Sequence, residues 1–167
     1  MKKSLVISLL LACCALGSPN RVAASPGGPT SPRWTSFHDP NLGVSAVFPQ
    51  NIFNVDAGSP PAGRGRQYAT SDGRALVAFF TLPNGEASKP GDYLSRMGVP
   101  KNAKLSYSRV TRRFFAISGI SGNRIFYNRC NTIGYSGSMR CVHLEYPSAE
   151  KRSWDKIVTR ISLSLHG

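Results

Sequence analysis

Acidic residues are scarce in this sequence. Its 167 residues include 8 Asp and Glu against 21 Lys and Arg, which gives a formal net charge of +13 at pH 7. The sequence contains no D-x-D-x-D stretch, which excludes a calcium loop of that kind. The basic residues are spread along the chain without a run of five or more like charges. We therefore expect either a solvated basic surface or a basic face that recognises an anionic partner.

Motifs for catalysis and metal binding are missing as well. The sequence lacks the G-x-S-x-G, H-E-x-x-H, C-x-x-C and P-loop patterns. His38 and His143 each favour a structural role over that of a catalytic base, and His166 is set aside as the penultimate residue. We predict no catalytic residues, no metal and no cofactor. The alternative is a hydrolase or lyase of an envelope polymer that uses two carboxylates brought together by the fold, drawn from Asp72, Asp92, Glu145 and Asp155.

No apolar run reaches the length of about 20 residues that a membrane-spanning helix needs. The run at residues 5–16 follows two lysines and precedes the small residues 22–24. This pattern predicts a secretory signal peptide over residues 1–24, with cleavage before Ser25. We therefore expect a periplasmic or secreted protein.

Export narrows the set of partners. It argues against nucleic acid, although the net charge after cleavage is still +10. The expected partner is a protein or an anionic component of the envelope, and the charge also allows peripheral association with a membrane. Residues 10–13 resemble a lipobox, so an alternative is that Cys13 is lipidated and anchors the domain on a membrane surface.

Cysteine is limited to four residues, two of which lie in the signal segment. The other two, Cys130 and Cys141, form an even pair at close spacing, which in an oxidising compartment predicts a disulfide. Glycines and serines between them let the chain turn back. A loop of this size would stabilise the fold by about 3 kcal/mol. The competing interpretation is a redox-active pair, although the spacing differs from C-x-x-C.

The mature chain is predicted to be a flexible leader over residues 25–32 and a single domain over residues 33–167. Alternating apolar residues and turn residues predict strands at residues 34–38, 44–48, 66–70, 75–82, 104–112, 114–118, 124–130 and 139–146. The run at 75–82 is almost entirely apolar, which predicts a central strand covered on both faces. In the last hairpin Cys130 would face Cys141, Asn128 would face His143, and Phe126 would face Glu145.

Two helices complete the predicted domain. A short one is expected over residues 90–97, and a longer one follows Pro147, with Ser148 as its cap. The longer helix has one apolar stripe at helical spacing, made of Trp154, Ile157, Val158, Ile161 and Leu165. The predicted fold class is α+β: an antiparallel sheet sandwiched by helices, with the C-terminal amphipathic helix packed on the sheet.

Two loops are candidate interaction sites. Residues 56–65 are rich in Pro and Gly and are predicted as a mobile basic loop, in which Arg64, with Arg66 just beyond it, would bind an anion. Residues 131–140 are predicted as the loop of the last hairpin. An exposed aromatic residue there is a natural contact for a partner, so we expect Tyr135 and Arg140 to form an interaction site.

Three further local features recur in a known superfamily: an aromatic–Pro step at Phe48 and Pro49, a Tyr–Leu pair at Tyr93 and Leu94, and the Ser–Leu repeat at residues 162–165. Together with the order of the predicted elements they resemble the PsbP/Mog1-like superfamily, which includes DcrB-type bacterial envelope proteins. The resemblance implies an antiparallel sheet between helices. It also implies non-catalytic roles, such as supporting a membrane complex, binding a GTPase or acting as an envelope accessory factor.

No binding residue of that superfamily carries over to this sequence by motif. The function expected from the sequence is that of an exported, non-enzymatic accessory or binding protein of the envelope. A secreted effector that acts on a host is a further alternative.

Overall fold

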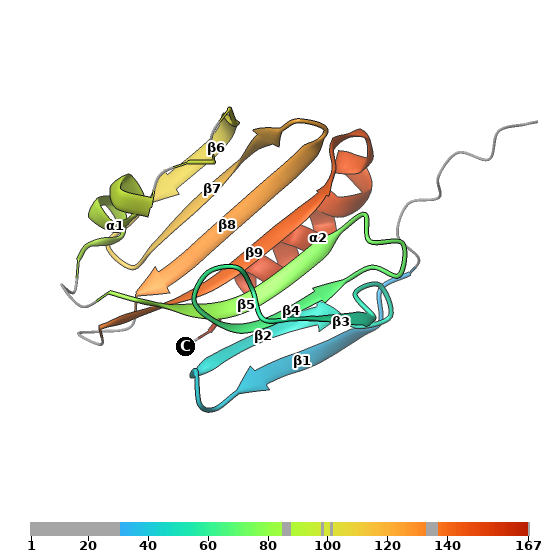
Figure 1. Cartoon of the computed structure of the whole chain (residues 1–167), viewed down its shortest axis with the longest axis horizontal. Coiled ribbons are helices and arrows are strands. Elements are labelled where there is room, and N and C mark those ends of the chain that lie inside the picture. The colour runs from blue at the N-terminus through green and yellow to red at the C-terminus, as the bar shows by residue number, and fades with distance from the viewer. Residues whose placement is uncertain (1–30, 85–87, 98, 101, 133–136, 167) are drawn as a thin grey trace, which may run out of the picture.

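The structure is a computed structural model that describes residues 31–84, 88–97, 99–100, 102–132 and 137–166. Antiparallel strands make up most of it (Figure 1). The elements along the chain are β1 (Trp34–Asp39), β2 (Val44–Pro49), β3 (Val55–Gly58), β4 (Arg64–Ala69), β5 (Leu76–Pro83), α1 (Pro90–Met97), β6 (Lys104–Val110), β7 (Phe114–Ser121), β8 (Arg124–Thr132), β9 (Ser138–Pro147), the 3₁₀ turn η1 (Ser148–Glu150) and α2 (Lys151–Leu163).

A seven-stranded antiparallel sheet is the centre of the fold, with the strand order β3-β4-β5-β9-β8-β7-β6. Most neighbours in the sheet are also neighbours in the chain, so the sheet is built mainly from hairpins. The exception is the pair β5–β9, which joins the two halves of the chain in the middle of the sheet. Strands β1 and β2 form a separate two-stranded sheet.

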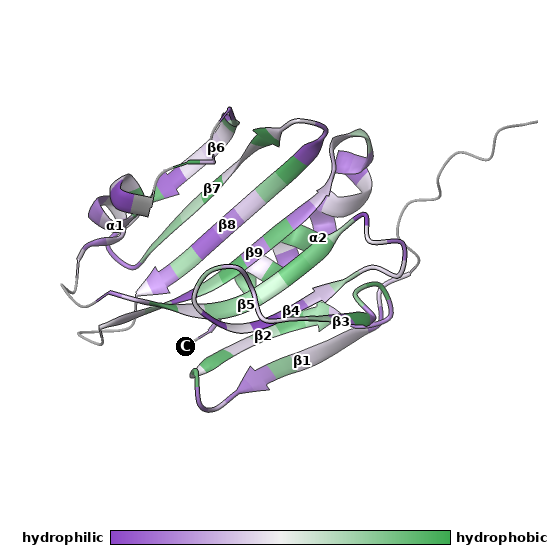
Figure 2. Cartoon of the chain, viewed as in Figure 1, coloured by the Kyte–Doolittle hydropathy of each residue, from purple (hydrophilic) through white to green (hydrophobic). Residues whose placement is uncertain are grey.

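The central strand β5 is covered on both faces, as its sequence predicts. Because side chains alternate along a strand, Val77 and Phe79 belong to one hydrophobic cluster, whereas Ala78 and Phe80 belong to another on the opposite face. All four residues are buried. Figure 2 shows β5 coloured as hydrophobic along most of its length.

Different elements cover the two faces of the sheet. On the α2 face, helix α2 and the β1–β2 hairpin pack over the first cluster, and α2 buries the whole predicted stripe: Trp154, Ile157, Val158, Ile161 and, just after the helix, Leu165. On the α1 face, Tyr93 and Leu94 of α1 pack against the second cluster. In Figure 1, α2 runs behind the sheet and α1 lies near the ends of β6 and β7. The predicted α+β fold is confirmed, and the β1–β2 hairpin is an addition to the α2 layer.

The last hairpin has the predicted register. Cys130 pairs with Cys141, and Asn128 pairs with His143 on the same face of the sheet. The two cysteines form a disulfide with an S–S distance of 2.03 Å. Both are buried in the second cluster, beside Phe115.

The prediction of one loop over residues 56–65 is wrong. Strand β3 begins at Val55 and pairs with β4, which begins at Arg64. Strand β3 is an edge strand, and its residues 55–57 are exposed. Backbone hydrogen bonds hold such a strand without a buried face, so no apolar alternation marks it in the sequence.

The predicted cap of the C-terminal helix is wrong too. Ser148 begins the 3₁₀ turn η1, and no side-chain cap is present at the start of either η1 or α2. Glu150, at the junction, instead accepts a hydrogen bond from Trp154 Nε1 at 3.1 Å and forms an ion pair with Arg74. The start of α2 is therefore tied to the β4–β5 turn through Glu150.

Candidate functional site

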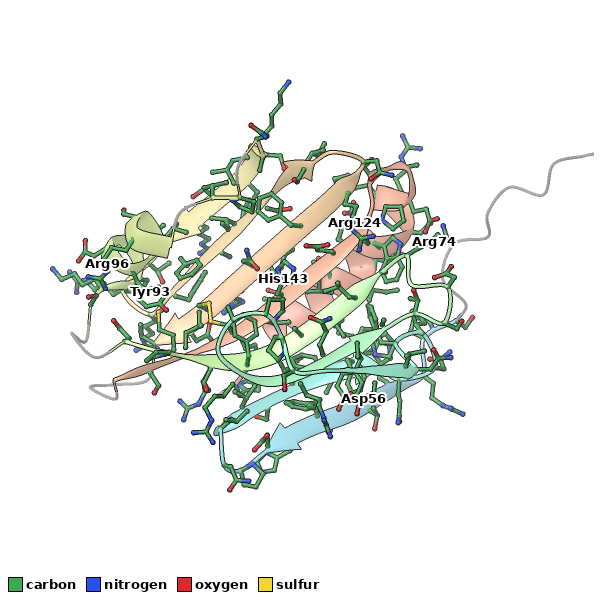
Figure 3. All side chains as sticks on the ribbon, in the orientation of Figure 1. Asp56, Arg74, Tyr93, Arg96, Arg124 and His143 are labelled. Carbon is green, nitrogen blue, oxygen red and sulfur yellow. A yellow bond between two sulfur atoms is a disulfide. The ribbon has the colours of Figure 1, made fainter. Side chains whose placement is uncertain are left out.

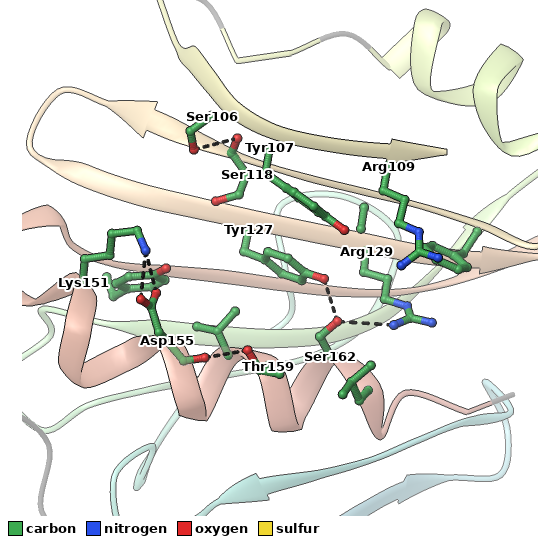
Figure 4. A pocket seen from close by; sticks show the side chains of 15 residues that line it. Ser106, Tyr107, Arg109, Ser118, Tyr127, Arg129, Lys151, Asp155, Thr159 and Ser162 are labelled. Carbon is green, nitrogen blue, oxygen red and sulfur yellow. Dashed lines mark hydrogen bonds and ion pairs between the residues drawn. The ribbon is translucent and has the colours of Figure 1, made fainter. Parts of the chain in front are cut away.

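The α2 face carries a groove over strands β6, β7 and β8. It lies between these strands and helix α2, and its cavity volume is about 780 Å³. Ligand sites in proteins typically have volumes of about 300–1,000 Å³. Figure 4 shows this cavity, which we call the β7 groove, with the side chains that line it.

Strand β7 supplies small side chains to the floor of the β7 groove, and its two neighbours supply large ones to the walls. The cross-strand rows are Arg109, Ala116 and Arg129 in one case, and Tyr107, Ser118 and Tyr127 in the other. The rows are two residues apart along the strands, which corresponds to about 7 Å. The floor is therefore a trough along β7, walled by arginine in one row and by tyrosine in the next.

Arg109 and Arg129 lie at one end of the groove (Figure 4), which Phe114 also lines. The guanidinium carbon of Arg129 is 4.3 Å from the centroid of the Phe114 ring, and that of Arg109 is 5.6 Å from it. Both distances are in the range of cation–π contacts. Neither arginine forms an ion pair with any carboxylate in the part of the chain that the structure describes. This end of the groove therefore holds two positive charges without a counter-charge among those residues.

The tyrosine row has one fixed and one exposed member. Tyr127 and Ser162 of α2 are joined by a hydrogen bond between their hydroxyl oxygens, 2.6 Å apart. Burial raises the pKa of Tyr127, so this hydroxyl stays protonated at neutral pH. Tyr107 is 45% exposed, and Leu163 on the α2 side of the groove is 68% exposed. The groove thus offers apolar surface next to its cationic end.

An ion pair within α2 lies at the opposite end of the groove (Figure 4). Lys151 Nζ donates to both carboxylate oxygens of Asp155, at 3.0 and 2.8 Å. Asp155 is the only carboxylate among the described residues that line the groove. Nearby, burial and, to a smaller extent, the charge of Asp155 raise the pKa of Tyr146 to about 12. The groove is therefore cationic at one end and electrically balanced at the other.

The carboxylates that a hydrolase would need lie on different elements. Asp72 lies in the β4–β5 turn, Asp92 in the first turn of α1 and Glu145 on β9, on the α1 face of the sheet. Within the described ranges no group of three or more His, Cys, Asp and Glu residues could hold a metal ion. In the same ranges, no helix has both the length and the apolar character that crossing a membrane requires.

A polar row crosses the α1 face of the sheet. The imidazole of His143 lies 2.5 Å from Asn128 Oδ1 through Nδ1 and 3.2 Å from Glu145 Oε1 through Nε2. Arg124 Nε donates to the other oxygen of Glu145 at 3.0 Å. The pKa of Glu145 is lowered, chiefly by its hydrogen bond with His143. Figure 3 shows His143 near the middle of the sheet, and its hydrogen bonds link it to two other members of the row.

The predicted anion-binding arginines lie on strand β4 and not in a loop. Arg66 Nε is 3.5 Å from Asp56 Oδ2, and both side chains are exposed. Arg64 and Arg140 lie on either side of β5, and both pair with Thr81. Anion binding by Arg64 and Arg66 remains a prediction.

The predicted interaction loop is only partly described. Tyr135 lies outside the described residues, and Arg140 lies on β9. The Arg140 guanidinium packs against Gly43 so closely that a Cβ at Gly43 would be 2.5 Å from Nη2. Burial lowers the pKa of Arg140, and its Nε and Nη1 are buried without a hydrogen-bond partner among the described residues. A contact role for Tyr135 and Arg140 remains a prediction.

The solved structures that resemble this one include the following two. The cyanobacterial PsbP protein (CyanoP) of Synechocystis sp. PCC 6803 has a TM-score of 0.59 at 12% sequence identity, over 86% of this chain and 98% of that chain. The Ran-binding protein Mog1p of Saccharomyces cerevisiae has a TM-score of 0.55 at 9% identity, over 81% of this chain and 96% of that chain. This chain has a PsbP/Mog1-like fold.

The PsbP/Mog1-like resemblance covers nearly all of both relatives, so it concerns the whole domain. At such low identity it establishes the fold alone. No protein-family model and no curated protein sequence matches this chain.

Proposed function

We propose that this protein is a non-enzymatic accessory protein of the cell envelope, which binds a partner protein through the β7 groove. The observation that carries the proposal is the trough along β7, in which two arginines without a described counter-charge lie next to exposed apolar surface. A concave site with that combination recognises an anionic, partly apolar surface.

Two further observations support the proposal. One of the similar structures is described as a Ran-binding protein. At least one protein of this fold therefore binds a protein partner. The disulfide between Cys130 and Cys141 suits an oxidising compartment, as does the signal-like segment at residues 1–24.

Site-specific photo-cross-linking in intact cells tests the binding role. A photo-reactive amino acid replaces Leu163, on the rim of the β7 groove, and in a matched control it replaces Val55, which is 44% exposed on the edge strand β3. We expect a discrete adduct with one protein from position 163 and none from position 55. The same adducts from both positions, or no adduct from either, would contradict a partner-binding role for the groove.

Two other measurements test the export and the lack of activity. Mass spectrometry of the protein recovered from the envelope or the medium should find Ser25 at the N-terminus, whereas an intact residue 1 would contradict export by cleavage. Incubation with purified envelope polymers should release no soluble fragment. Release that Asp155→Asn abolishes would instead establish the hydrolase alternative.

A further inference from the structure

We propose that Arg109 and Arg129 hold a carboxylate of an acidic peptide segment that belongs to the partner protein. The inference rests on the proposed function and names the chemistry by which the β7 groove would recognise its partner. The two arginines lie on the strands that flank β7, and Ala116 lies between them in the same row. Two strand spacings separate their Cα atoms, which is about 10 Å.

The small residue between the arginines leaves room for a ligand atom. An alanine methyl group reaches only a short way from the sheet, whereas both guanidinium groups extend over the floor toward Phe114. A carboxylate placed over Ala116, beside the Phe114 ring, would meet donor groups of two arginines that project from the strands on either side of β7. Planar guanidinium groups bind carboxylates through two parallel hydrogen bonds, which adds geometric selectivity to the charge attraction.

The donors of the two arginines are mostly unused within the described residues. Arg129 donates hydrogen bonds from Nε to Asn131 Oδ1 at 3.0 Å and from Nη1 to Ser162 Oγ at 3.4 Å. These contacts fix the orientation of its guanidinium group. The side chain of Arg109 donates no hydrogen bond to a described residue and is exposed on β6. One arginine is thus held in place by the protein, while the other is able to close over a bound group.

The surroundings favour a peptide over an isolated anion or a lipid head group. The cavity of about 780 Å³ continues past the arginines along the tyrosine row to the ion pair of Lys151 and Asp155. Its rim is apolar at Tyr107 and Leu163. A segment with an acidic residue for the arginines and apolar residues for the rim would fill the groove. A head group would use only the cationic end. Recognition of an anionic bilayer surface typically uses clusters of about four to eight basic residues, whereas the described lining of the groove has Arg109, Arg129 and the paired Lys151.

Selection of peptides on the folded chain tests the inference. A random 12-residue peptide library is displayed on phage and selected against the full domain, and the binding of selected peptides is measured by fluorescence polarisation. We expect the selected peptides to be enriched in Asp or Glu next to apolar residues. Arg109→Gln combined with Arg129→Gln should weaken their binding by at least about 10-fold, since hydrogen bonds between charged groups are lost.

The chain offers a matched control. Arg112 and Arg113 are exposed in the β6–β7 turn and do not line the groove, so Arg112→Gln with Arg113→Gln removes the same charge elsewhere. This control should change the affinity less than 3-fold. Arg109→Gln alone is a second variant that removes no described hydrogen bond, so it tests the inference without disturbing Ser162 or Asn131. Arg109→Lys with Arg129→Lys should also weaken binding, because lysine keeps the charge but lacks the planar pair of donors that a guanidinium group offers to a carboxylate.

The inference is overturned if the selected peptides show no acidic enrichment, or if the control pair weakens binding as much as the groove pair. It is also overturned if inorganic phosphate or vesicles of phosphatidylglycerol bind the groove and compete with the peptides at lower concentration. Failure here is distinguishable from failure of the proposed function. In that case cross-linking from position 163 would still capture one protein, and the Gln variants would leave its yield unchanged.

Discussion

At the scale of single residues, the groove depends on the small volume of the Ala116 and Ser118 side chains. Each lies between two large side chains, and the contrast in size creates the trough. The same principle acts at Gly43, where the missing side chain admits the guanidinium of Arg140. Small residues in this protein therefore determine where the arginine side chains can lie.

The β4–β5 turn provides a prediction at the same scale. Asp72 accepts hydrogen bonds from the Thr70 hydroxyl at 2.6 Å, from the Arg74 backbone at 3.0 Å and from Arg74 Nε at 2.7 Å. The Thr70 bond, followed by those from Arg74, lowers the pKa of Asp72 to about 2. Because the folded-state pKa is depressed below its unfolded value of about 3.9, the stabilisation is complete above about pH 4 and disappears as the pH falls through about 2.

Replacing Asp72 by Asn should therefore lower the free energy of unfolding at pH 7 by about 0.5–1 kcal/mol, a small effect because the side chain is half exposed to solvent. Urea denaturation of both proteins at pH 7 and at pH 2 measures it. The difference between them should be much smaller at pH 2, where about half of the Asp72 carboxyls are protonated in the folded state. A difference that is equally large at both pH values would place the effect in the shape of the turn and not in the carboxylate charge.

At the scale of elements, the sequence predicted those parts of the fold whose signals are local. The stripe on α2 and the alternation in the β8–β9 hairpin specified which residues are buried and that Cys130 pairs with Cys141. Strand β3 was missed, because an exposed edge strand has no apolar pattern. Local signals are sufficient for elements that bury a face, and they are insufficient for elements held by backbone pairing alone.

The β7 groove was missed for a different reason. The spacing of Tyr107 and Arg109 in one strand, and of Tyr127 and Arg129 in another, places each pair on one face, and that much is visible in the sequence. Which face it is, and that the two pairs lie on either side of β7, depends on the pairing of β6, β7 and β8. Register between strands is a tertiary property, and one residue of slip would turn either pair to the opposite face.

Gly65 lies where β4 pairs closely with β5, opposite Phe80, and we expect this pairing to be sensitive to a larger side chain. A Cβ at Gly65 would lie 2.1 Å from the Phe79 carbonyl oxygen and 2.6 Å from Phe80 Cα, so the backbone of β5 would have to move. Gly65→Ala should lower the free energy of unfolding by about 1–3 kcal/mol in urea denaturation. Gly91→Ala in α1 is the control: its Cβ would meet only Val110 Cγ1 at 3.4 Å. Because alanine favours a helix, the control should leave stability unchanged or raise it, and equal losses in both variants would refute the steric argument.

The disulfide makes a second prediction at this scale. Cys130 and Cys141 lie in adjacent strands whose pairing continues on both sides of the bond, so the fold should persist without it. Cys130→Ala with Cys141→Ala should lower the free energy of unfolding by about 3 kcal/mol, chiefly because the unfolded chain gains freedom. Wild-type protein unfolded in urea with a reducing agent should show a similar loss. An unchanged midpoint in the double variant would show that the bond adds no stability to the hairpin.

At the scale of the whole molecule, the two hydrophobic clusters share one sheet. Strands β5 and β9 contribute alternate residues to each: Phe79 and Val142 to the cluster under α2, and Phe80 and Cys141 to the cluster under α1. Loss of order in these strands would therefore disrupt both clusters at once. The domain should therefore unfold as one cooperative unit, although its two faces have no apolar side chains in common.

Met139→Ala tests this cooperativity. Met139 is fully buried in the cluster under α1, whereas both tryptophans, Trp34 and Trp154, lie on the α2 face. The substitution should lower the free energy of unfolding by about 2–5 kcal/mol, through lost burial and the cavity that it leaves. Tryptophan fluorescence and far-ultraviolet circular dichroism should report the same lowered urea midpoint, as they should for the control Ile161→Ala in the other cluster. If Met139→Ala shifted the circular dichroism transition and left the fluorescence transition where it is in the wild type, the two faces would unfold separately. The groove could then stay intact after loss of the α1 layer, whereas a single shared transition means that the groove exists only while the whole sheet is folded.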